Sequence, residues 1–88
     1  MAYSDEMPEL ARDPIQIGNL IRRARKKRMW SQEELAGKTG LRQATISLIE
    51  SGNPASKLAT LLTVLAALDL EFQIAPRSRF ESQMEDWI

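Results

Sequence analysis

The segment SQEELAGKTGLRQATISLIESG, residues 31–52, predicts two short helices joined by a tight turn. Ser31 and Glu34 have the spacing of a capping box, so a helix is expected over residues 32–39. Gly40 then supplies the left-handed conformation that commonly ends a short helix, and a new helical pattern starts almost at once. Two helices joined by so few residues must cross steeply.

The second helix of this pair, residues 43–50, has an apolar inner face and a small, polar outer face. Ile46 and Ile49 fall on the inner side. The outer side carries three small or polar residues: Gln43, Ala44 and Ser47. A helix fits the major groove of B-DNA only if its outward side chains are small or are flat hydrogen-bonding groups. The pattern therefore predicts a recognition helix.

Four residues form the predicted base-reading set: Arg42, Gln43, Ala44 and Ser47. Arg42 can form a bidentate pair with guanine O6 and N7, and Gln43 with adenine N6 and N7. Ala44 can touch a thymine methyl group, and Ser47 can donate to or accept from either base type. Leu48 has two readings: it packs sideways, or it touches a methyl group.

A helix on each side of this pair completes a predicted, mostly α-helical domain over residues 13–69. Asp13, Pro14 and Gln16 have the pattern of a capped helix start, and the first helix is expected to run to about Met29. Its buried stripe is predicted to contain Ile17, Leu20, Ile21 and Ala24. Ser56 can cap a last helix, whose predicted stripe is Leu58, Leu61, Leu62, Leu65 and Leu68.

After this domain the hydrophobic period changes from 3.6 to 2, which predicts a short strand over residues 70–76. Its alternating apolar residues are Leu70, Phe72 and Ile74. Because a lone strand leaves its edges unpaired, we expect it to pair with the same strand of a second subunit across a two-fold axis. Residues 1–12 are predicted to be a flexible leader and residues 77–88 a disordered tail.

Basic charge is concentrated in the middle of the chain, although the whole chain carries 12 basic and 12 acidic residues. Residues 14–57 contain nine basic and three acidic residues, a net charge of +6, whereas each flank has a net charge of −3. Such a block is typical of proteins that bind phosphates. The alternative reading is a solvated helix face.

The composition argues against several classes of protein. The chain has no cysteine and no histidine, which removes thiol nucleophiles, disulfides, the commonest general base and the commonest metal ligand. We therefore expect no enzymatic activity, no metal and no cofactor. The longest nearly apolar run, residues 58–68, is about half of what a bilayer span needs, so the expected location is the cytoplasm, in association with the nucleoid.

The central segment closely resembles the helix-turn-helix of the Xre/Cro, or phage-repressor-like, family. The matching residues are Gln32, Leu35, Ala36, Gly40, Ile46, Ser47, Glu50, Ser51 and Gly52. With the arginine-rich helix before them, they extend the resemblance over residues 14–68 and imply a compact, lambda-repressor-like domain of four or five helices. The resemblance also implies a structural ion pair between Arg25 and Glu50.

The same resemblance implies contacts to the DNA backbone. Gln32, Lys38 and Thr45 occupy the family's phosphate-contacting positions. Asn53 and Lys57, in and after the next loop, are secondary candidates for the same role.

The flanks resemble one branch of this family, the HipB antitoxins. The features that carry this resemblance are Asp13-Pro14, residues 42–47, the strand and Trp87 near the end of the chain. It implies a homodimer that binds palindromic DNA in its own promoter and that also binds a HipA serine/threonine kinase toxin, with Trp87 as a docking residue. Two alternatives remain open: a stand-alone or phage-type repressor without a toxin, and an interaction adaptor that has lost DNA binding.

Overall fold

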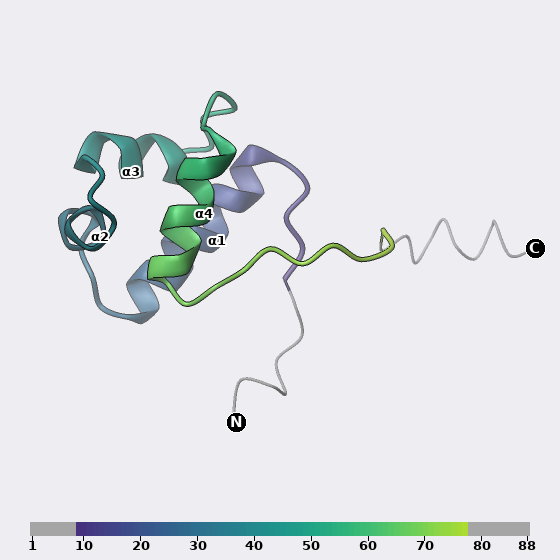
Figure 1. Cartoon of the computed structure of the whole chain (residues 1–88), viewed down its shortest axis with the longest axis horizontal. Helices are drawn as coiled ribbons and strands as arrows, with labels where there is room; N and C mark the ends of the chain where they lie inside the picture. The colour runs from purple at the N-terminus through teal and green to yellow at the C-terminus, as the bar shows by residue number, and fades with distance from the viewer. Residues whose placement is uncertain (1–8, 78–88) are drawn as a thin grey trace, which may run out of the picture.

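Four helices account for the regular structure of residues 9–77, the part of the chain that the computed structural model describes (Figure 1). They are α1 (Pro14–Lys27), α2 (Gln32–Thr39), α3 (Gln43–Glu50) and α4 (Leu58–Ala67). α3 packs on α1 and α2, and α2 also packs on α4. The expected mostly α-helical, helix-turn-helix architecture is confirmed.

Local signals in the sequence set the starts of α1 and α2 and the end of α2. The Asp13 carboxylate accepts a hydrogen bond from the Gln16 backbone N–H at 2.8 Å. Ser31 Oγ accepts from the Glu34 N–H at 3.0 Å, and Glu34 Oε1 accepts from the Ser31 N–H at 2.7 Å, which completes the predicted capping box. α2 then ends on Gly40, whose φ of 74° is the left-handed value that glycine adopts without strain.

All four helices contribute to one core. Its fully buried side chains are Ile21, Leu35, Ile46, Val64 and Leu68. Gly18 lets the first half of α1 approach the end of α3 closely, because a Cβ there would lie 2.5 Å from the Ile49 carbonyl oxygen. This contact fixes the last turn of α3 against α1.

Three local predictions for α1 and α4 were wrong. α1 ends at Lys27 instead of near Met29, because the chain turns into the left-handed region at Met29. The cap of α4 is Lys57, which makes no side-chain capping bond, and not Ser56. The buried stripe of α4 differs from the predicted one, because α4 packs mainly on α2. Leu58 and Leu62 are exposed, Leu65 and Leu68 are buried as predicted, and Val64 is buried although it was not predicted.

The turn between α1 and α2 contains a strained residue. Met29 has a φ of 61° and its side chain is 87% exposed, so no packing offsets its left-handed backbone. We expect Met29→Gly to raise the free energy of unfolding by about 1 kcal/mol. Urea denaturation measures this gain. Asp69→Gly is the matched control, since Asp69 has a φ of 59° but aspartate tolerates this region better, and its gain should be smaller. A Met29→Gly protein that is no more stable than the wild type would contradict the strain.

The segment after α4 leaves the helices as a single trace (Figure 1). Within residues 70–77 of this single chain no strand is assigned, and Leu70, Phe72 and Ile74 are exposed. The pairing of this segment across a homodimer stays a prediction. The predictions for residues 1–8 of the leader and residues 78–88 of the tail, with Trp87, lie outside the described residues.

No helix within residues 9–77 is long and apolar enough to cross a membrane.

Candidate nucleic-acid interface

α3 presents the face that the sequence assigned to base reading. Gln43, Ala44 and Ser47 are exposed, whereas Ile46 and Ile49 are buried. Arg42 precedes the helix in an extended conformation, is exposed, and makes no side-chain capping bond. The four proposed base-reading residues therefore lie on the exposed part of α3 and at its first turn.

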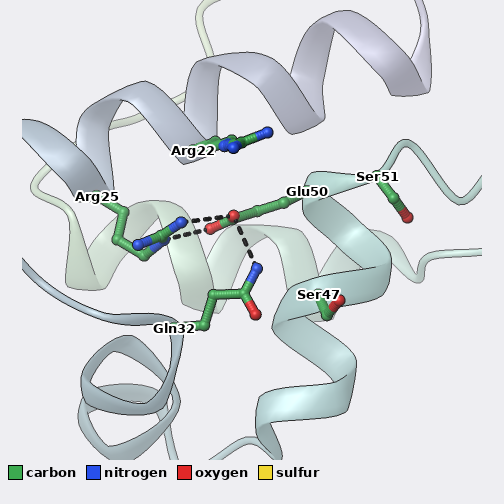
Figure 2. Close-up of a pocket in the computed structure, with 6 residues that line it drawn as sticks. All are labelled: Arg22, Arg25, Gln32, Ser47, Glu50 and Ser51. Carbon is green, nitrogen blue, oxygen red and sulfur yellow. Dashed lines mark hydrogen bonds and ion pairs between the residues drawn. The ribbon is translucent and has the colours of Figure 1, made fainter.

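An ion pair beneath this face ties α3 to α1. Arg25 Nε donates to Glu50 Oε2 at 2.7 Å, and Arg25 Nη2 donates to Glu50 Oε1 at 3.0 Å (Figure 2). Both residues are only 8% exposed. Arg25 Nη1 also donates to the Trp30 carbonyl oxygen at 2.8 Å, so the guanidinium holds the end of the α1–α2 turn as well.

The Arg25 guanidinium stays charged. The hydrogen bond that Arg25 donates to Glu50 raises the pKa of Arg25 above its ordinary value, although burial acts in the opposite direction. The bidentate geometry is the form of arginine–carboxylate pair that fixes both partners in orientation. Glu50 is therefore a fixed anchor for any third residue that donates to it.

Gln32 is that third residue, and it links the ion pair to the base-reading face. Gln32 Nε2 donates to Glu50 Oε1 at 3.1 Å, and Gln43 Nε2 donates to Gln32 Oε1 at 3.4 Å. A continuous chain of hydrogen bonds thus runs from Arg25 to Gln43. The Gln43 carboxamide keeps its second N–H and its carbonyl oxygen for a base, which is the donor and acceptor pair that adenine needs.

A polar hollow lies beside this chain of hydrogen bonds. It has a volume of about 250 Å³ and is lined by Arg22, Arg25, Gln32, Ser47, Glu50 and Ser51 (Figure 2). Since the Arg25 charge is balanced by Glu50, Arg22 is the residue that adds a positive charge to its wall. Arg22 and Ser51 were not among the predicted site residues. Arg22 lies three positions before Arg25 on α1, and this helical spacing was the available signal.

The other predicted backbone contacts lie outside this cluster. Lys38 Nζ stands 4.6 Å from the centroid of the Trp30 ring, which the Arg28 guanidinium also approaches at 5.2 Å. Asn53 Oδ1 accepts from the Ala55 N–H at 3.0 Å and so stabilises its own loop. The remaining two candidates are Thr45, half-buried in the first turn of α3, and Lys57, exposed at the start of α4.

The crossing of α2 and α3 around an exposed, polar α3 face defines a helix-turn-helix protein, and the Helix-turn-helix family model matches residues 21–74. The chain belongs to the HipB-like branch of the Xre/Cro helix-turn-helix family.

Three comparisons carry this assignment. The chain is 36% identical over 61 residues to antitoxin HipB of Escherichia coli strain K12, which covers 69% of each protein. It is equally similar to antitoxin HipB of Escherichia coli O6:H1 (strain CFT073), of which it spans 65%, slightly less than two thirds. A chain of the solved HipA-HipB-O2-O3 complex superposes with a TM-score of 0.73 at 33% identity, covering 81% of this chain and all of that one.

Proposed function

We propose that this protein is a transcriptional repressor and the antitoxin of a HipA-type serine/threonine kinase, and that it binds an inverted-repeat operator in its own promoter as a homodimer. The observation that carries this proposal is the exposed α3 face, which the Arg25–Glu50–Gln32–Gln43 chain of hydrogen bonds holds in place. The protein acts by binding alone, without enzymatic activity, metal or cofactor.

Base reading and backbone binding have different roles in this mechanism. Arg42, Gln43, Ala44 and Ser47 meet base edges in the major groove and give sequence preference. Gln32, Thr45 and Lys57, with Lys38 and Asn53, meet phosphates and give affinity without sequence preference. Arg22 joins this second group, because it lines the polar hollow next to Gln32 and Ser47.

Dimerisation sets the form of the operator. A dimer with two-fold symmetry places two recognition helices about 34 Å apart, one turn of B-DNA, and so selects an inverted repeat. The exposed apolar residues Leu70, Phe72 and Ile74 supply the contact between subunits, through antiparallel pairing of residues 70–76. Occupation of the promoter by this dimer blocks transcription.

The similarity to HipB supports the kinase partner. HipB, at 36% identity, is an antitoxin, and it is seen in complex with HipA in a structure that superposes on this chain. Surfaces away from α3 hold the kinase, so that one dimer can bind operator and toxin together. Trp87 is a docking residue in this arrangement. A stand-alone repressor is not favoured, because such a repressor has no need to resemble HipB, which is seen in complex with HipA.

The experiment for this proposal uses the full-length protein and the DNA upstream of its own gene. We expect a dimer in sedimentation analysis, and binding to an inverted repeat in that DNA at least 10³-fold tighter than to unrelated duplex of the same length. A duplex with a single half-site should bind much more weakly than the full repeat. Equal affinity for all these duplexes would overturn the proposal.

Arg42→Ala separates base reading from backbone binding. We expect a loss of about 1–3 kcal/mol of binding free energy on the operator and a relaxed preference at one base pair of each half-site. Fluorescence anisotropy with single-base-pair operator variants measures both effects.

Lys57→Ala is the matched control for Arg42→Ala, because it removes an exposed positive charge outside the base-reading set. It should weaken binding to all sequences alike and reduce the salt dependence by about one counterion per half-site. If Arg42→Ala behaves in the same way as Lys57→Ala, Arg42 contacts a phosphate and not a base.

A further inference from the structure

Leu48 is an exposed leucine on the recognition helix. It is 52% exposed, and it belongs neither to the buried core cluster nor to the half-buried residues that pack against that cluster. Sideways packing, one of the two readings that the sequence allowed, does not account for the half of the side chain that stays in water. A leucine in this position leaves apolar surface in water on a helix that otherwise shows small or polar side chains outward.

The position of Leu48 on α3 is that of a base-reading residue. It follows Ala44 by four positions and Ser47 by one, so it shares the outward half of the helix with both. Ala44 and Leu48 are neighbours on one face, one helical turn apart, and together they form a small apolar strip beside the polar residues Ser47 and Ser51.

The backbone at Leu48 is held by hydrogen bonds, whereas its side chain is 52% exposed. Its carbonyl oxygen accepts from the Asn53 N–H at 3.0 Å and from Ser51 Oγ at 2.9 Å. These bonds close the end of α3 and fix the direction in which the side chain leaves the helix. An apolar side chain whose backbone is already fixed loses little conformational entropy when it binds a partner.

The major groove offers one apolar group, the C5-methyl of thymine. We propose that Leu48 is a specificity-determining residue that selects a thymine by burying this methyl group, at a base pair distinct from the one under Ala44. This inference rests on the proposed function, since it requires α3 to lie in the major groove. It predicts that one further position of each half-site contains a thymine.

The test removes single methyl groups from the operator. The probe is the inverted-repeat duplex that the full-length protein binds best, synthesised with one thymine at a time replaced by deoxyuridine, which lacks only the C5-methyl. At one position of the half-site, we expect the wild-type protein to lose about fourfold in affinity, the effect of one buried methyl group. Leu48→Ala should bind the thymine and deoxyuridine duplexes equally at that position, and Leu48→Met should restore the preference.

Two controls keep the outcome clear. Leu10→Ala removes a leucine of similar exposure outside the helices, and it should leave every methyl dependence unchanged. Any methyl dependence due to Ala44 falls at another position and should persist in Leu48→Ala. Thermal unfolding of Leu48→Ala should match the wild type, because the side chain contributes nothing to the core.

Three results would overturn the inference. If the wild-type protein prefers one operator but Leu48→Ala keeps its full methyl dependence, Leu48 reads no methyl group and the proposed function stands. If no deoxyuridine replacement weakens wild-type binding, Leu48 again reads no methyl group, and the proposed function again stands. If the wild-type protein shows no sequence preference at all, the proposed function fails and this inference fails with it.

Discussion

Glu50→Ala is expected to lower the free energy of unfolding by about 3–5 kcal/mol. The substitution leaves the Arg25 guanidinium, which is 8% exposed, without its carboxylate partner in the interior. It also removes the acceptor of Gln32 Nε2, so a second, half-buried donor loses its hydrogen bond. Because a small domain is stabilised by only about 5–15 kcal/mol, the variant should be largely unfolded at moderate temperature.

An exposed ion pair provides the matched control for Glu50→Ala. Glu9 pairs with Arg23, and both side chains are more than half exposed. Glu9→Ala should cost less than about 1 kcal/mol, because water screens such pairs. Urea denaturation of the two variants measures the difference. If they are equally stable, the Arg25–Glu50 pair is not the buried anchor described above.

A double variant separates lost charge balance from lost shape. Arg25→Met combined with Glu50→Leu removes both charges and fills the site with apolar side chains, so it should recover much of the stability lost in Glu50→Ala. It should not recover DNA binding, because Gln32 still lacks its acceptor and no longer positions Gln43. Recovery of both properties would show that the ion pair has no role in positioning the base-reading face.

Gly18→Ala is expected to cost about 3 kcal/mol, although alanine is the better helix former. The added Cβ would lie 2.5 Å from the Ile49 carbonyl oxygen and 2.7 Å from that of Glu50, and both are backbone atoms that cannot rotate away. α1 must therefore separate from the end of α3, which also disturbs the Arg25–Glu50 pair. Urea denaturation measures the loss of stability, and binding to the operator measures the displacement of α3.

Gly37→Ala is the control for Gly18→Ala. Gly37 is exposed in α2, and an added Cβ there would meet nothing within 4 Å. This variant should gain about 0.5–1 kcal/mol through helix propensity alone. Equal effects at Gly18 and Gly37 would show that α1 and α3 do not approach as closely as described.

Features that depend on nearby residues could be predicted from the sequence. The Ser31–Glu34 capping box and the left-handed Gly40 use only short-range chemistry, and both are present as expected. The helical period also gave the inward residues Ile46 and Ile49 correctly. These local signals agree with one another along α2 and α3, which is why the central part of the fold was predictable.

Features that depend on packing between helices could not be predicted in the same way. Periodicity marked Leu58 and Leu62 as core residues, but how much of α4 is covered depends on where α2 lies. The end of α1 was placed too late, because α-helical spacing continues to Met29 while the backbone turns there.

The candidate site shows the same division. Resemblance paired Arg25 with Glu50, and the structure places them in contact. Gln32 bonds to Glu50, 18 positions away, and to Gln43, 11 positions away. No local sequence pattern predicts either hydrogen bond. Arg22 was passed over because it lies in a basic run whose members look alike in the sequence.

The chain of hydrogen bonds from Arg25 to Gln43 links folding to recognition. The same Glu50 that balances a buried charge also orients Gln32, which in turn contacts Gln43 on the exposed face. In the proposed interface, a side chain held in this way loses less freedom when it meets a base, which favours affinity and discrimination together. Substitutions deep in the α1–α3 contact should therefore alter operator preference as well as stability.

The antitoxin and repressor roles are tested most directly by capture of the tagged protein at native levels from its own cells. The captured material is divided, and the proteins retained after nuclease treatment are identified by mass spectrometry while the DNA of the untreated half is sequenced. We predict a stoichiometric serine/threonine kinase encoded beside this gene, together with DNA from their shared promoter. Promoter DNA without any kinase would contradict the antitoxin role, and a kinase without promoter DNA would contradict the repressor role.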